Sequence, residues 1–175
     1  MPERTAVIDF ETTGMSPAQG ARPTEIGVAM IEDGRIVARY QSLINAGAWV
    51  PPFIEQLTGI SNAMVRSAPP VAEVMAEAAE FIGDAPLLPH NAAFDAKFWD
   101  AELGLVGRRR GRDFACSLLL SRRLLPEAPS HSLGNLNRWV GLPSTGQAHR
   151  ALADAEVAAN LTLHLQELLW GRHDI

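Results

Sequence analysis

Two acidic residues close to the start of the chain have the spacing of a catalytic pair. Asp9 and Glu11 are two residues apart in a short apolar run, so in a strand both side chains leave the same face. Two adjacent carboxylates at the end of a buried strand repel each other unless a positive group neutralises them. No lysine or arginine lies beside them in the sequence. Alone, the pair has a second interpretation, in which both side chains end the strand in solvent.

Two further carboxylates stand far away in the sequence. Asp95 lies in the first turn of a predicted helix, where a helix N-terminus attracts anions; alone, it would be read as a favourable dipole contact. Asp154 lies on the core-facing stripe of the last predicted helix, where an unpaired carboxylate is costly. Four carboxylates from three segments suit two hard divalent cations, Mg²⁺ or Mn²⁺, rather than zinc.

Phosphoryl transfer is the chemistry that needs such a pair of ions. Two ions about 4 Å apart bind the attacking and leaving oxygens, and a histidine accepts the proton of water. His149 precedes Asp154 by five positions, and on one helix the two would be turned about 140° apart. We therefore predict that His149 lies in the loop or first turn before that helix. The remaining histidines are interpreted as inert, although the first adjoins the Asp95 segment: His90, His131, His164 and His173.

The element pattern indicates how these residues are positioned. Strands are predicted at 5–11, 25–32 and 34–44, with Asp33-Gly34 as a tight hairpin turn between the last two, so these three form an antiparallel meander. A short apolar run at 85–89 is a candidate fourth strand. Helices are predicted at 53–58, 71–82, 92–103 with Asn91 as N-cap, 115–124, 132–140 and 150–170. Strands first and helices afterwards predict an α/β protein with a mixed sheet flanked by helices.

Length and composition limit the class of protein. The 175 residues suit a single domain, 1–175, and 47% hydrophobic residues without an 18-residue apolar run indicate a folded chain that does not cross a membrane. A signal-like start is not found, so a cytoplasmic location is the expectation. The net charge of −5 argues against a protein that coats nucleic acid electrostatically. Cys116, the only cysteine, excludes an intrachain disulfide.

The three acidic segments resemble the motifs of the DEDDh exonucleases, the family that includes the proofreading subunit of bacterial DNA polymerase III. Residues 9–14 (DFETTG), 90–95 (HNAAFD) and 149–155 (HRALADA) are similar to the first, second and third motifs. Weaker likenesses at 24–27, 57–61, 132–136 and 141–142 extend the resemblance over nearly the whole chain. It implies a ribonuclease H-like fold, with a mixed five-stranded sheet and helices on both sides.

The resemblance also implies a role for each site residue. Asp9, Glu11 and Asp154 would hold one metal ion, and Asp9 would share the second with Asp95. His149 would be the general base, and the products would be nucleoside 5′-monophosphates. The residues implied to bind substrate fall into three groups: Thr12, Thr13, Gly14 and Met15 around the terminal nucleotide, Thr58, Gly59 and Ile60 packing on it, and Asn91 and Phe94 at the next nucleotide.

The sequence thus predicts a metal-dependent 3′–5′ exonuclease acting on single-stranded DNA 3′ ends in proofreading or repair. An RNA 3′-trimming or oligoribonuclease-like enzyme stays open, because the same catalytic residues serve both polymers. A non-catalytic nucleic-acid-binding module is disfavoured, since all four carboxylates and the histidine are present.

Two further segments bear on which partners the protein could have, and each has two interpretations. Residues 166–170 (QELLW) faintly resemble a sliding-clamp-binding peptide, yet they continue a helical pattern, so they are interpreted as the end of the core helix. A polymerase or clamp partner is therefore an open possibility. The loop Arg108–Arg112 either steers the phosphate backbone toward the cleft or is a solvated surface.

Overall fold

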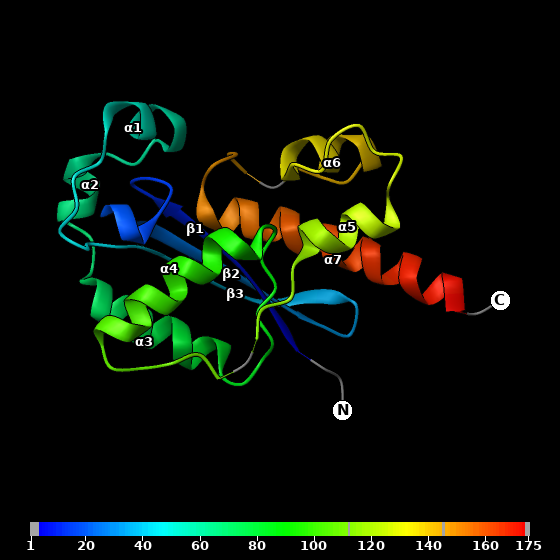
Figure 1. Cartoon of the computed structure of the whole chain (residues 1–175), viewed down its shortest axis with the longest axis horizontal. Coiled ribbons are helices and arrows are strands. Elements are labelled where there is room, and N and C mark those ends of the chain that lie inside the picture. The colour runs from blue at the N-terminus through cyan, green and yellow to red at the C-terminus, as the bar shows by residue number, and fades with distance from the viewer. Residues whose placement is uncertain (1–3, 112, 145, 174–175) are drawn as a thin grey trace.

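The chain folds around a three-stranded antiparallel sheet (Figure 1). The computed structural model describes residues 4–111, 113–144 and 146–173; Arg112 and the side chain of His173 lie outside the described residues. Strands β1 (Thr5–Thr12), β2 (Pro23–Glu32) and β3 (Arg35–Leu43) pair in that order, so the predicted meander is confirmed. Asp33 and Gly34 both have positive φ, at 53° and 75°, as a two-residue hairpin turn requires.

The α-helices follow the strands, as predicted, and one short 3-10 helix of the described residues lies between β1 and β2. Their bounds are η1 (Pro17–Gln19), α1 (Pro52–Thr58), α2 (Asn62–Arg66), α3 (Val71–Ile82), α4 (Ala92–Leu105), α5 (Ser117–Leu124), α6 (Leu133–Val140) and α7 (Ala151–His173). Helix α2 was not predicted, because five residues are too few to show a helical period. It begins at a local signal, in which the Ser61 hydroxyl accepts a hydrogen bond from the Met64 amide at 3.1 Å.

The sheet is covered on both faces, and the alternation along β1 decides what each face holds (Figure 1). Ile8 and Phe10 pack toward α3 and α4 in the main core. Val7 packs on the other face, together with Ala155 and Ala159 of α7. Because side chains alternate along a strand, Asp9 and Glu11 share the face of Val7. Both carboxylates therefore point toward α7.

The predicted five-stranded sheet is wrong in strand number, because the described residues contain three strands. Leu87, in the segment predicted as a fourth strand, forms single parallel bridges to Ala6 and to Phe114. The segment around Leu87 contains Pro86 and Pro89. Neither has an N–H group to extend the ladder, so the pairing stops after one position. Among the helices within the described ranges, none combines the length and apolar character that crossing a bilayer requires.

Candidate active site

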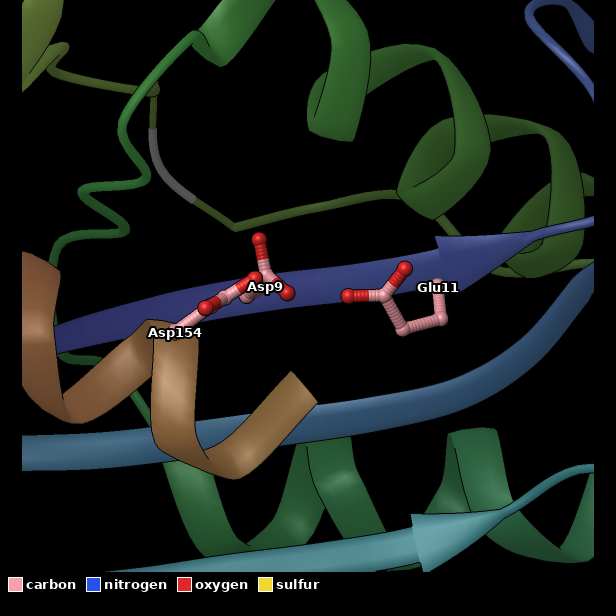
Figure 2. A group of neighbouring side chains, drawn as sticks. All are labelled: Asp9, Glu11 and Asp154. Atoms are coloured by element: carbon pink, nitrogen blue, oxygen red, sulfur yellow. The ribbon is translucent and has the colours of Figure 1, made fainter. Parts of the chain in front are cut away.

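Three of the predicted carboxylates meet between β1 and α7. Asp9 and Glu11 come from β1, Asp154 comes from the first turn of α7, and the Asp154 side chain points toward Asp9 (Figure 2). One oxygen from each of the three lies within 4.8 Å of the others. We call these three residues the acidic cluster. Its members are separated by up to 145 positions in the chain, and only the packing of α7 on β1 brings them together.

A glycine in β2 lets α7 approach this closely. Gly27 pairs with Asp9 across the sheet. A Cβ added at Gly27 would lie 2.4 Å from backbone atoms of Ala151 and Leu152, at the start of α7. Any side chain at this position would push the helix away from the strand. Sequence reasoning did not select Gly27, although it stands in the weak likeness at 24–27.

Burial makes the acidic cluster electrostatically unfavourable without a cation. Burial raises the pKa of Asp9 well above its ordinary value, and the neighbouring charges of Asp95 and Glu11 raise it further. Burial and the Asp154 charge raise the pKa of Glu11 to about 8. Burial also raises the pKa of Asp154. The Oδ2 atom of Asp9 is buried and accepts no hydrogen bond from any described residue. Oxygen donors without a positive partner fit a hard divalent cation.

Asp95 lies next to the acidic cluster but is engaged elsewhere. It is buried in the first turn of α4, and its Oδ1 accepts a hydrogen bond from the Phe10 amide at 3.0 Å. Burial raises its pKa to about 7, whereas this hydrogen bond lowers it. Among the described residues, the group within 4.8 Å contains Asp9, Glu11 and Asp154 and not Asp95. The role of Asp95 as a metal ligand stays a prediction.

His149 lies in the loop before α7, with an exposed side chain and a φ of 60°. Its amide donates hydrogen bonds to both carboxylate oxygens of Asp154, at 3.1 and 3.3 Å. His149 and Asp154 also line one cavity of about 420 Å³ between α6 and α7. Asp154 therefore connects the acidic cluster to the histidine loop. The role of His149 as general base stays a prediction.

The loop after β1 is held by its own polar groups and by α4. The Thr12 hydroxyl donates to the Gly14 carbonyl at 2.7 Å, and the Thr13 hydroxyl accepts from the Arg22 amide at 3.0 Å. The Lys97 ammonium donates to the Met15 carbonyl at 3.4 Å. The Met15 side chain is 74% exposed. Of this predicted group, Met15 is the one whose side chain is freely available to a nucleotide.

The second group of predicted substrate contacts, residues 58–60, is only partly accessible to a nucleotide. Thr58 and Ile60 are buried, and the Thr58 hydroxyl bonds within its own segment, to the Ile54 carbonyl and the Ile60 amide. Within residues 58–60, Gly59 is exposed and is therefore the residue that a nucleotide can contact. A Cβ at Gly59 would lie 3.6 Å from the Gln147 side chain, so the end of α1 faces the loop that carries His149.

Asn91 occupies the N-cap position of α4, as predicted, but it lacks the side-chain hydrogen bond of a usual cap. Its φ is 103°, and its side chain makes no capping hydrogen bond. The Asn91 carbonyl instead accepts from the Phe94 amide at 3.0 Å. The Asn91 side chain is exposed, and Phe94 is half-buried against Phe98 with ring centroids 5.0 Å apart. Both side chains stay candidates for a nucleotide contact.

His90 is held in the interior rather than in the acidic cluster. Its Nδ1 lies 3.0 Å from the Ser117 hydroxyl, and its Nε2 lies 2.7 Å from the His131 carbonyl. Burial lowers its pKa. These contacts join the second motif to the start of α5, which agrees with the interpretation of His90 as structural.

The arginine loop lies at the opposite end of α4 from Asp95. Arg110 pairs with Asp100 at 3.6 Å and stands over the Phe114 ring at 5.0 Å. Arg108 and Arg109 are exposed. A cavity of about 340 Å³ lies between these arginines and the C-terminal half of α4. Neither interpretation of the loop is decided by this position.

Sequence comparisons place these motifs among known exonucleases. The model of the RNase_T family, described as exonuclease, matches residues 6–162. The 3′-5′ exonuclease DinG of Bacillus subtilis (strain 168) is 37% identical over 171 residues, which are 95% of this chain and 18% of that protein. DNA polymerase III subunit epsilon of Aquifex aeolicus (strain VF5) is 32% identical over 173 residues, 97% of this chain and 83% of that protein. The chain thus spans less than a fifth of the DinG relative.

Solved structures agree with the fold. Exonuclease X, solved in complex with 5′ overhanging duplex DNA, has a TM-score of 0.77 and 25% identity over 93% of this chain and 91% of that chain. The nuclease domain of 3′hExo, a DEDDh family member bound to rAMP, has a TM-score of 0.81 at 17% identity over 95% of this chain and 92% of that chain. The predicted α/β ribonuclease H-like fold is confirmed.

Proposed function

The chain belongs to the RNase_T exonuclease family, and from this membership we propose that it is a metal-dependent exonuclease that releases nucleoside 5′-monophosphates from single-stranded DNA 3′ ends. The observation that carries the proposal is the acidic cluster, whose half-buried carboxylates have no lysine or arginine in ion-pair distance among the described residues. On an exonuclease fold, such a cluster is suited to bind the cations that phosphodiester hydrolysis requires.

Each carboxylate has a proposed share in metal binding. Asp9, Glu11 and Asp154 would hold one ion, and Asp9 with Asp95 would hold the second. Two Mg²⁺ or Mn²⁺ ions, when bound, would supply positive charge to the attacking and leaving oxygens of the phosphodiester. The Oδ2 atom of Asp9 supports this assignment, because it is buried and accepts no hydrogen bond from the described part of the chain.

The protein's own groups would position the substrate and move the proton. The His149 imidazole stands in the loop that the Asp154 carboxylate holds, and it would take the proton of the attacking water. The exposed Met15 side chain, at the tip of a loop held by Thr12 and Thr13, would contact the terminal nucleotide. The exposed backbone at Gly59 would face the same nucleotide across the loop of His149.

DNA is the proposed polymer because several sequence relatives are named as DNA polymerase III proteins, the epsilon subunit of Aquifex aeolicus among them. A polymerase partner in proofreading is part of this proposal. Residues 166–170 lie within α7, so the proposal does not include a clamp-binding peptide in extended form. RNA 3′ trimming is the second candidate, as the catalytic residues serve both polymers.

The test uses matched 5′-labelled DNA and RNA oligomers of the same sequence. With Mg²⁺, the wild type should shorten the DNA stepwise from its 3′ end, and excess chelator should stop the reaction. Asp154→Asn should be inactive, whereas Glu167→Gln, a change on an exposed part of the same helix, should be fully active. Faster shortening of the RNA would replace DNA by RNA as the substrate, and no shortening of either polymer would remove the exonuclease proposal.

A further inference from the structure

Glu25 is a further carboxylate beside the three of the acidic cluster, and it is ion-paired with Arg150. Glu25 pairs with Glu11 across the sheet, and it is 1% exposed. Its Oε1 accepts from Arg150 Nε at 3.1 Å and from the Ala151 amide at 2.8 Å. Its Oε2 accepts from Arg150 Nη2 and from Gln41 Nε2, each at 2.7 Å. With four donors on its two oxygens, Glu25 is committed to these partners and not available to an ion.

The contacts of Glu25 fix the first turn of α7. The Ala151 amide is one of the N–H groups that a helix leaves without an internal partner at its start, and a carboxylate there is also favoured by the helix dipole. Arg150 adds a forked pair of hydrogen bonds, which sets orientation as well as distance. The Glu25 carboxylate, the Arg150 guanidinium and the Ala151 amide together are called the α7 anchor below.

Asp154 and His149 depend on this turn for their positions. Asp154 is three residues after Ala151, so it lies one turn further along on nearly the same side of the helix. The His149 loop is held by Asp154 in turn, through the two hydrogen bonds from the His149 amide. A shift of the first turn would therefore move a metal ligand and the proposed base together.

The rest of α7 does not need the anchor to stay on the sheet. Ala155, Ala158 and Ala159 pack on β1 and β2, and Leu161 and Leu165 are buried against α5 and α6. The effect of the anchor is thus confined to the end of the helix that carries the site.

We propose that the Glu25–Arg150 ion pair is a positioning device for catalysis, which holds Asp154 and His149 over Asp9 and Glu11. The proposal rests on the proposed exonuclease function. Neither Glu25 nor Arg150 would contact the reacting phosphate; both act through the first turn of α7. Gly27 is the steric part of the same arrangement, because it leaves room for that turn.

The test compares two ion pairs that connect the sheet to α7. Glu25→Gln and Arg150→Gln weaken the anchor. Glu156→Gln is the matched control, because Glu156 pairs with Arg39 of β3 only two residues after Asp154 and at the surface. The anchor variants should lose roughly 10- to 100-fold in kcat per folded molecule, with KM for the oligomer within about twofold, because a misplacement of about 1 Å costs that much rate. The control should keep wild-type kcat.

Mn²⁺ binding without substrate gives a readout separate from turnover. Titration followed by electron paramagnetic resonance should show weaker Mn²⁺ binding in both anchor variants and unchanged binding in Glu156→Gln. Arg150→Lys keeps the charge but loses the fork, so it should restore part of kcat relative to Arg150→Gln. Gly27→Ala leaves all charges in place and should give the same loss of kcat and of Mn²⁺ binding.

Two results would overturn the positioning role. One is a loss of activity in Glu25→Gln that is fully explained by the fraction of unfolded protein, as measured by circular dichroism. The other is unaltered Mn²⁺ binding in Glu25→Gln, Arg150→Gln and Gly27→Ala. A wild type without exonuclease activity would remove the proposed function alone, because the Mn²⁺ titrations still decide whether the anchor positions Asp154.

Discussion

Buried and half-buried carboxylates occur at two kinds of place in this molecule, and the two kinds differ in whether an arginine forms an ion pair with them. Glu25 and Glu102 each receive a forked arginine: Arg150 Nε and Nη2 at 3.1 and 2.7 Å, and Arg22 Nε and Nη2 at 2.6 and 2.9 Å. The acidic cluster receives no such ion pair from the described part of the chain. Arginine thus neutralises the carboxylates that hold the fold together.

The difference indicates which charge is reserved for an external cation. A buried carboxylate that is neither paired nor bound to metal is costly, and Asp9 even keeps one oxygen atom without a hydrogen-bond partner among the described residues. Among the described residues, no arginine or lysine forms an ion pair with Asp9, although its carboxylate lies within 4.8 Å of those of Glu11 and Asp154. We interpret this lack of a paired positive charge as the feature that suits the acidic cluster to a cation.

The largest effect is expected at Asp9. Asp9→Asn removes a central ligand and should lower kcat by about 10³-fold or more, roughly 4 kcal/mol of barrier. The same change removes a buried repelling charge, so the metal-free variant should unfold at a higher temperature than the wild type. Exonuclease kinetics and thermal unfolding in chelator measure the two effects. A variant that is inactive and less stable than the wild type would contradict the account of the cluster.

Glu102→Gln should produce the opposite pattern. It breaks a pair in which the Glu102 side chain is 3% exposed, so the free energy of unfolding should fall by about 3 kcal/mol. Turnover per folded molecule should stay within about twofold of the wild type, because Glu102 lies on α4 outside the acidic cluster. Urea unfolding and kcat at saturating oligomer check this. A large loss of kcat in the folded protein would erase the distinction between the two kinds of carboxylate.

The metal-free protein should become less stable as pH rises. An acid whose pKa is higher in the folded state takes up protons on folding, so the free energy of unfolding falls between its unfolded and folded pKa values. That window runs from 4.5 to about 8 for Glu11 and from 3.8 to about 7 for Asp95. Between pH 5 and pH 8 the free energy of unfolding should therefore fall by several kcal/mol.

Saturating Mg²⁺ should flatten this pH dependence, because a bound cation favours the ionised carboxylates. Urea unfolding at a series of pH values, with chelator and with Mg²⁺, makes the comparison. Equal curves under the two conditions would mean that the acidic cluster does not bind the ion. The Asp9→Asn variant in chelator should show a shallower slope than the wild type, since one of the repelling charges is gone.

The smallest effect is expected in the arginine loop. Arg108→Ser with Arg109→Ser changes two exposed residues at the end of α4 away from Asp95. We expect kcat/KM to change by about twofold or less, with a nearly unchanged dependence on salt concentration. A clearly weaker salt dependence would show that the loop guides the phosphate backbone after all, and would extend the substrate path along α4.

The parts of the site that follow local rules could be predicted from the sequence. The two-residue spacing of Asp9 and Glu11 gives one strand face, and the turn residues Asp33 and Gly34 give the hairpin. The helical stripe that contains Asp154 identifies the face of α7 that meets the sheet. Each of these depends on neighbours in the chain, so the pattern is visible in a single sequence.

The parts that depend on distant contacts could not be predicted. Glu25 and Arg150 are 125 positions apart, and nothing local to either residue indicates the other. The strand number was wrong because Leu87 pairs at one position between prolines. Asn91 is the N-cap residue of α4 as predicted, but its φ of 103° and the missing side-chain hydrogen bond could not be inferred from its residue type.

The most direct test of the central claim is a Mn²⁺ titration of the substrate-free protein followed by electron paramagnetic resonance, with wild type, Asp9→Asn and Glu167→Gln side by side. The account predicts that wild type and Glu167→Gln bind Mn²⁺ equally and that Asp9→Asn loses the binding. Equal Mn²⁺ binding by Asp9→Asn and the wild type would contradict the claim that the unpaired carboxylates between β1 and α7 form the cation site.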